Sequence, residues 1–162
     1  MHPNHLPPLL ETGCGVVAGA TLTLALASMA AQIVFRYLIG SSLVWSEEVA
    51  RYALIWSAMF GSAAAYQRGG HMALTVAVDL LPPPVAGLAY RLIHLIVIVF
   101  AGLVTWHGAL LTMRNFERDQ LSPALQIPIA WAYLAIPVGG ILIAFAAALG
   151  LWRGLAPSRH EG

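Results

Sequence analysis

The sequence contains no lysine, a single cysteine and very little charge of either sign. Charged residues make up 9% of the chain, against about 25% in a typical soluble domain. With 59% hydrophobic residues and a mean hydropathy of +0.77, the chain is predicted to be an integral membrane protein. The net charge of +1 is not gathered into a basic face, so nucleic acid is not expected as a partner. The single Cys14 excludes an intramolecular disulfide and any cysteine pair for redox or metal chemistry.

Four apolar runs are each long enough for a membrane-spanning helix, because about 20 helical residues cross a hydrocarbon core of about 30 Å. They predict an all-α integral membrane protein with one membrane domain over residues 1–162. The segment between the second and third runs is too short to span and ends in three prolines, which predicts a short amphipathic helix in the membrane interface. The predicted spans cover residues 13–37, 48–66, 85–113 and 128–152, and the interfacial segment covers residues 71–81.

Small residues recur at every fourth position in three of these spans, where they let another helix approach closely. We expect the first and second spans to pack on each other through these positions. In the fourth span, Pro137 predicts a kink or a local break, because proline lacks an amide hydrogen and its ring clashes with the preceding turn. The small-residue positions are Gly15, Gly19, Thr23, Ala27 and Ala31, then Ala53, Ser57, Gly61 and Ala65, and finally Gly140, Ala144 and Ala148.

A polar bridge, residues 35–52, separates the first two spans and carries two arginines and two glutamates. Charge beside a span is costly, so these side chains are expected at the membrane boundary or paired with one another. Ser46 is expected to cap the second helix. Arg51 follows Glu48 by three residues and Glu47 by four, so it can pair with either. Two interpretations remain open: a capped helix end at the interface, or a docking or ion-handling site.

A second charged island, residues 114–126, connects the third and fourth spans. From its composition it is expected to be a solvated connection with local ion pairs, each of which contributes little to stability. Its charged residues are Arg114, Glu117, Arg118 and Asp119.

Three histidines raise the question of a metal or haem site. His94 and His107 lie about 20 Å apart along one predicted helix, and no other span offers a histidine at either depth, so haem ligation is disfavoured. Both are expected to make polar contacts between helices or within one. His71 is expected to hydrogen-bond to nearby backbone at the interface, because no second metal ligand lies at a suitable spacing.

Two blocks of residues, taken in order and spacing, are specific enough to point to a family. The first block is Arg36-Tyr37, Trp45-Ser46-Glu47-Glu48, Arg51-Tyr52, Trp56, Gly61, Arg68-Gly69 and His71. The second is Ser122-Pro123-Ala124-Leu125, Ile127-Pro128, Tyr133 and Pro137. Through these blocks the chain resembles, over most of its length, the small membrane subunit (DctQ type) of tripartite ATP-independent periplasmic, or TRAP, transporters.

The resemblance implies a small permease subunit of a sodium-coupled, binding-protein-dependent secondary transporter in the bacterial inner membrane, with both termini cytoplasmic. It implies two protein partners besides membrane lipids. A large permease subunit of DctM type carries the substrate and sodium sites, and a periplasmic binding protein of DctP type delivers a C4-dicarboxylate, keto acid or sugar acid. The small subunit is then expected to be a scaffold for the large one, with no enzymatic activity, cofactor or metal of its own.

The resemblance also assigns expected roles to the polar residues. It places the island 114–126 on the periplasmic side, where a modest, polar contact suits a binding protein that must dock and leave. Binding-protein contact is therefore expected for Arg114, Glu117, Arg118 and Asp119. Subunit-interface or structural roles are expected for Arg36, Trp45, Glu47, Glu48, Arg51, Tyr52, Trp56, Gly61 and His71.

A stand-alone four-helix transporter and a membrane redox protein are the alternatives. The redox protein is disfavoured because the chain lacks cysteine pairs, histidines at matching depth and any nucleotide-binding motif. A stand-alone transporter is expected to place an ionisable residue near mid-membrane, facing a cavity. Three spans carry none there, and the third offers only His94 and His107 toward its two ends. This shortage favours the scaffold, whose chemistry resides in a partner.

Overall fold

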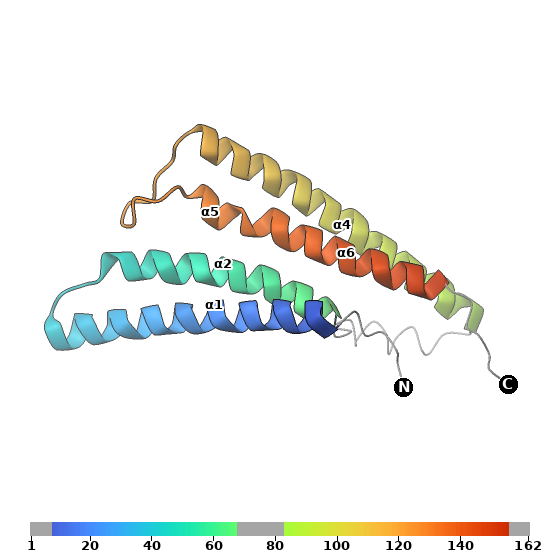
Figure 1. The fold of residues 1–162 in the computed structure, drawn as a ribbon, viewed down its shortest axis with the longest axis horizontal. Coiled ribbons are helices and arrows are strands. Elements are labelled where there is room, and N and C mark those ends of the chain that lie inside the picture. The colour runs from blue at the N-terminus through green and yellow to red at the C-terminus, as the bar shows by residue number, and fades with distance from the viewer. Residues whose placement is uncertain (1–7, 68–82, 156–162) are drawn as a thin grey trace.

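A computed structural model describes residues 8–67 and 83–155, and their regular structure is helical (Figure 1). The all-α prediction is therefore confirmed for these residues. The predicted interfacial segment 71–81, with His71, lies outside them. The elements are α1 (Pro8–Val34), a π-helical turn η1 (Phe35–Ile39) that continues it, α2 (Val44–Gln67), α4 (Pro83–Glu117), α5 (Ala130–Tyr133) and α6 (Ala135–Leu155).

Three stretches in the described part are long and apolar enough to cross a membrane: Thr12–Ile39, Val85–Glu117 and Ala130–Trp152. They correspond to the first, third and fourth predicted spans, and they make this a membrane protein by composition. α2 is not among them, although its 24 residues are long enough to cross. Its first two turns carry three charged residues, so a fourth span remains a prediction.

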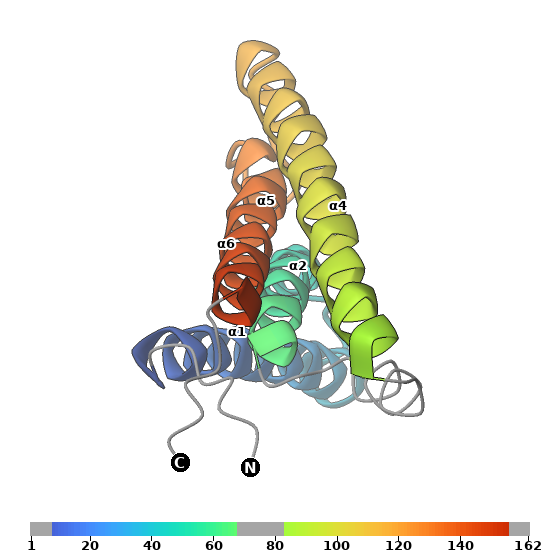
Figure 2. The ribbon, with the colours of Figure 1, turned by 90° about the vertical axis from the view of Figure 1, so that its right-hand side faces the viewer.

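The helices form two hairpins that meet through their inner members (Figure 1). α1 packs along α2, and α4 packs along α6, while α2 lies against α6. Viewed toward the helix ends, α2 lies between α1 and the α4–α6 hairpin (Figure 2). Because the outer helices α1 and α4 each pack on one side only, most of their apolar surface is exposed; Phe100 of α4, for example, is 66% exposed.

The predicted packing of the first span on the second is confirmed. Ser57 donates a hydrogen bond to the carbonyl of Ala18 at 2.9 Å, and a Cβ added at Gly61 would lie 3.9 Å from Ala18 Cβ. Small side chains thus let the two helices approach closely. Two buried clusters continue this contact along the hairpin: Cys14 with Ala63 and Ala64, and Ala25 with Ala50 and Ala53.

The face that α1 presents to α2 is not the predicted one. Three of its five predicted positions, Gly19, Thr23 and Ala27, are exposed. A strict four-residue repeat drifts around a helix of 3.6 residues per turn, so it cannot follow a straight contact. The buried and half-buried positions of α1 alternate in steps of four and three residues, as in packed helix pairs. They are Cys14, Ala18, Thr21, Ala25 and Ser28.

The fourth predicted span has a local irregularity at Leu134, which keeps helical backbone angles and donates to the Ala130 carbonyl at 2.9 Å. α5 ends at Tyr133 and α6 begins at Ala135. Pro137 lies four residues after Tyr133. A proline cannot donate a hydrogen bond to the carbonyl four residues before it, and its ring clashes with that carbonyl, so the Tyr133 carbonyl loses its helical partner. The hydrogen-bond pattern of the helix is therefore altered one turn before the proline, while the helical path continues.

Candidate functional site

Glu48, in the first turns of α2, joins the two charged islands of the sequence. Its carboxylate accepts three hydrogen bonds from the connection between α4 and α5: from the Ser122 hydroxyl, from the Ala124 amide at 3.1 Å and from the Leu125 amide at 3.0 Å. Glu48 is only 8% exposed and Ser122 is fully buried. Hydrogen bonds to a carboxylate are stronger than those between neutral groups, so this contact ties the two hairpins together.

The connection that meets Glu48 is folded by its own backbone. Leu121 and Pro128 form an isolated antiparallel bridge, and the Ser122 amide donates to the Ile127 carbonyl at 2.8 Å. Gln126, with a φ of +55°, closes the turn by donating its amide to the Ser122 carbonyl at 3.1 Å. The turn aims successive backbone amides at one point, which is an arrangement that binds an anion. Glu48 supplies that anion from another helix.

The expected cap at Ser46 is wrong. A cap at Ser46 requires the helix to begin at Glu47, but α2 begins at Val44, three residues earlier, so Ser46 lies inside the first turn. Its hydroxyl donates back to the Leu43 carbonyl at 2.6 Å instead of accepting from a following amide. Serine inside a helix commonly makes this backward bond.

Arg51 pairs with Glu47, one of the two partners that the sequence allowed. The nitrogen and oxygen atoms are 3.2 Å apart, and both side chains are 62% exposed. An exposed pair at this spacing stabilises a helix by only about 0.3–0.5 kcal/mol. Glu48 turns to the other side, toward Ser122, so the two glutamates and Arg51 do not form one ion-pair group.

The other residues named for the polar bridge lie in two environments. Arg36 is exposed on η1 with its guanidinium 6.0 Å from the centre of the Tyr37 ring, and Trp45 is also exposed. Further along α2, Tyr52 is half-buried and Trp56 stacks on Phe60 with ring centres 5.7 Å apart. The subunit-interface roles of these side chains remain predictions.

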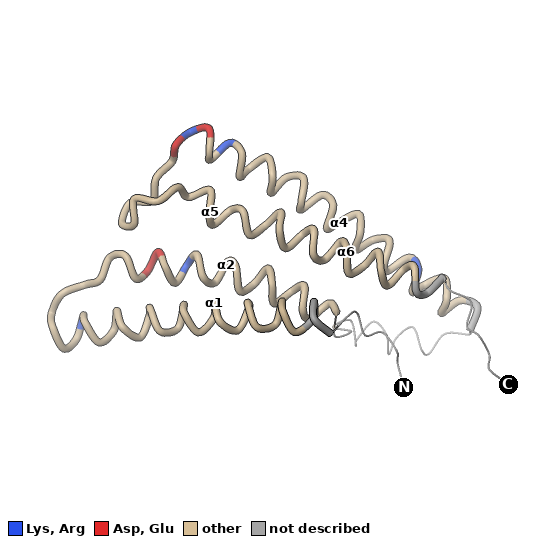
Figure 3. Tube along the Cα trace, viewed as in Figure 1, with Lys and Arg blue, Asp and Glu red and all other residues tan. Residues whose placement is uncertain are grey.

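Among the residues whose side chains the structure describes, charge is concentrated at one end of the molecule (Figure 3). Within residues 12–67 and 85–152, every charged residue except Arg91 lies toward the end where α1 leads into α2 and α4 into α5. All four charged residues of the second island are exposed there. Their predicted contact with a binding protein is compatible with this exposure and remains a prediction.

Comparison with known proteins identifies the family. The family model described as "Tripartite ATP-independent periplasmic transporters, DctQ component" matches residues 25–156. The chain belongs to this family. It is 30% identical over 119 residues to the C4-dicarboxylate TRAP transporter small permease protein DctQ of Rhodobacter capsulatus, covering 74% of this chain and 52% of that relative. It is 29% identical over 120 residues to the sialic acid TRAP transporter small permease protein SiaQ of Vibrio cholerae, covering 74% and 68%.

The chain thus spans about half the length of the Rhodobacter relative. A third similarity is to a longer protein, the isethionate TRAP transporter permease protein DctMQ of Oleidesulfovibrio alaskensis. There, 101 residues match with 29% identity and cover 62% of this chain but only 16% of the relative. A DctQ-like segment therefore also occurs inside a much larger permease chain.

The partners of Glu48 are the site residues that the sequence interpretation missed. Ser122, Ala124 and Leu125 belong to the second block of residues on which the resemblance to the family was based, but no interaction was predicted for them. A serine and a proline in a polar loop give no local sign of which helix they meet. The signal available was the presence of two separated polar blocks in one small, apolar chain, since buried polar groups need partners.

The two described histidines of this DctQ chain make helix contacts, as predicted. His94 Nδ1 lies 2.6 Å from the Tyr66 hydroxyl, which links α4 to α2. His107 Nδ1 lies 2.9 Å from the Leu103 carbonyl in its own helix. Each ring therefore has a structural role in the hydrogen bonding of the helices.

Proposed function

We propose that this chain is the small permease subunit of a sodium-coupled, binding-protein-dependent transporter for organic acids, and that it acts as a scaffold for a large permease subunit in the inner membrane. The observation that carries the proposal is the triple hydrogen bond to Glu48. These hydrogen bonds hold the two helical hairpins in a fixed relative position. They also occupy the most buried carboxylate of the site, which holds a loop instead of binding a solute.

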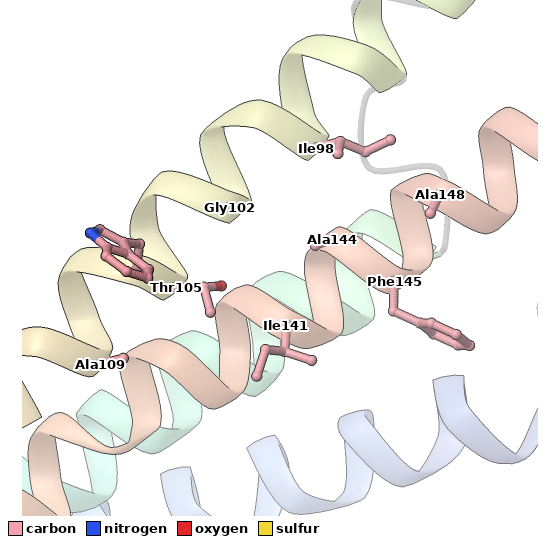
Figure 4. Close-up of a pocket in the computed structure, with 9 residues that line it drawn as sticks. Ile98, Gly102, Thr105, Ala109, Ile141, Ala144, Phe145 and Ala148 are labelled. Atoms are coloured by element: carbon pink, nitrogen blue, oxygen red, sulfur yellow. The ribbon is translucent and has the colours of Figure 1, made fainter.

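The distribution of polar groups supports a scaffold. A transport pathway through this chain would need ionisable or polar groups facing a cavity at membrane depth. A groove of about 520 Å³ does run between α4 and α6 (Figure 4), but its lining is almost entirely apolar. The one hydroxyl in it, on Thr105, already donates to the Ala101 carbonyl at 2.8 Å. The groove suits a lipid chain or an apolar side chain better than an organic acid.

The longer relatives support a large permease as the partner. The matched segment covers 16% of the DctMQ protein, and 20% of the sialic acid TRAP transporter permease protein SiaT of Haemophilus influenzae. In such chains the DctQ-like segment is held beside the remaining permease covalently. In a separate small subunit, that proximity has to come from a non-covalent interface.

We also propose four crossings, with α2 as the fourth span and both termini cytoplasmic. α1 begins and α6 ends at the same end of the molecule, which supports an even number of crossings (Figure 1). The charged end with Glu47, Arg114 and Arg118 then faces the periplasm.

The function is tested by reconstitution into liposomes. We expect the purified chain alone to give no sodium-driven uptake of the organic acid that its cognate binding protein retains. Uptake should appear when the large subunit and the binding protein are added, because the substrate pathway lies in the large subunit. Sodium-driven uptake by the chain alone would contradict the proposal and favour a stand-alone transporter.

The charged end provides a second test, directed at the binding protein. Exposed charges steer encounter between proteins more than they add affinity. We therefore expect Arg114→Glu combined with Arg118→Glu to lower uptake at limiting binding-protein concentration, with a smaller loss at saturation, and to leave assembly with the large subunit intact. Arg91→Glu, at the opposite end of α4, is the matched control. A double mutant whose uptake curve superimposes on that of the unchanged protein would place docking on the large subunit alone.

A further inference from the structure

The first helix reaches further than α2 at the charged end of the molecule. α1 continues through η1 to Ile39, and α2 begins only at Val44 (Figure 1). Gly40, with a φ of +74°, ends the helical path. Residues 33–45 form a tip that contains the end of α1, η1 and the first two residues of α2, and that projects past Glu48.

The length of this projection follows from which residues of α1 and α2 lie opposite each other. Ala18 meets Ser57 and Gly61, and Ala25 packs with Ala50 and Ala53. In an antiparallel pair this register places Glu48 beside Met29. The ten residues from Ala30 to Ile39 then extend about 15 Å beyond the level of Glu48, at about 1.5 Å per residue.

The surroundings of Glu48 argue for placing this residue at the edge of the hydrocarbon core. The carboxylate is bonded to the connection between α4 and α5, which is irregular backbone next to the exposed charges of Arg118 and Asp119. Irregular backbone and exposed charge do not face lipid tails. The apolar stretch Thr12–Ile39 is longer than the about 20 residues that a crossing needs. With the connection at the membrane boundary, the part of α1 and η1 beyond Glu48 is the part expected outside the hydrocarbon core.

This projecting tip is nevertheless apolar. Tyr37 is 77% exposed and Leu38 is 81% exposed, and Ile33, Ile39, Val44 and Trp45 are exposed around them. Arg36 is the only charged residue of the tip. Lipid tails cannot cover a surface that stands outside the core, and a contiguous apolar surface in water marks an interaction site.

We propose that this tip is a docking surface for the large permease subunit, an inference that rests on the function proposed above. A binding protein that docks and leaves calls for a polar contact, whereas permanent interfaces are more apolar. The tip therefore fits the permanent partner. The partner surface that it fits is apolar, with an acidic group facing Arg36, because a charge buried by docking needs a counter-charge.

Cysteine accessibility tests the inference in membranes. In a Cys14→Ala background, Leu38→Cys is labelled with a membrane-impermeant maleimide, in vesicles of both orientations, with and without the co-expressed large subunit. We expect strong labelling of the chain alone and a loss of labelling in the complex, to the level of the cysteine-free chain. Gln120→Cys, on the exposed connection between α4 and α5, reports that the reagent reaches that side.

Two results would overturn the inference. Absence of labelling in the chain alone would mean that the tip is covered by lipid or by a second copy. Equal labelling with and without the large subunit would mean that this partner does not cover it. Co-purification of the two proteins, measured in the same samples, distinguishes a wrong docking surface from a wrong scaffold function. If they co-purify while Leu38→Cys stays labelled, only the docking surface is wrong; if they do not co-purify, the proposed scaffold function fails as well.

Discussion

Glu48→Ala is expected to loosen the contact between the two helical hairpins and to lower the thermal midpoint of the purified chain by several degrees. The substitution removes the acceptor of the Ser122 hydroxyl and of the Ala124 and Leu125 amides. Ser122 is fully buried, and a buried donor left without an acceptor retains its full cost of desolvation. Assembly with the large subunit should fall with it, because the relative position of the hairpins would no longer be fixed.

Glu47→Ala is the matched control for this experiment. It removes the same charge from the adjacent residue, but it breaks only the exposed pair with Arg51, which contributes about 0.3–0.5 kcal/mol. Unfolding in detergent, followed by circular dichroism, compares the two variants. Ser122→Ala should fall between them, since the two backbone amides keep their acceptor. Equal midpoints for Glu48→Ala and Glu47→Ala would show that the triple hydrogen bond does not stabilise the fold.

Gly139→Ala is expected to have the second large effect, at the contact of α6 with α2. A Cβ at this position would lie 2.7 Å from Met59 Cβ and 3.4 Å from Met59 Cα. Those atoms belong to or adjoin the backbone of α2, so the helices would have to move apart. Overpacking of this kind costs about 1–3 kcal/mol. The free energy of unfolding in detergent should therefore fall by about 1–3 kcal/mol.

Gly102→Ala controls for the change in helix propensity. Gly102 lies inside α4, and a Cβ there would meet no atom within 4 Å. Alanine is favoured over glycine within a helix by up to about 1 kcal/mol. The Gly102 variant should therefore match or exceed the stability of the unchanged chain. A loss of stability as large as that of Gly139→Ala would mean that glycine replacement is harmful for a reason other than the α2–α6 contact.

The features that could be predicted from the sequence are those that depend on local chemistry. Long apolar runs with few charges require helices that satisfy their own backbone hydrogen bonds in a membrane, and three such stretches are present. Pro137 predicted a local disturbance in the fourth span, which lies at Leu134, because the effect of a proline acts within one helical turn. The pairing of Arg51 was limited to two partners for the same reason, since helical neighbours lie three or four residues apart.

Which surfaces and polar groups meet could not be predicted from the sequence and is seen in the folded chain. Glu48 bonds to Ser122, 74 residues away in the chain, and no local pattern specifies such a partner. The contact face of α1 depended on the path of α2 along it, which a regular repeat of small residues did not reveal. The projection of Leu38 past α2 likewise follows from the register of two packed helices. Contacts between distant segments depend on how whole helices fit together, and this fit is a property of the folded chain rather than of any short segment.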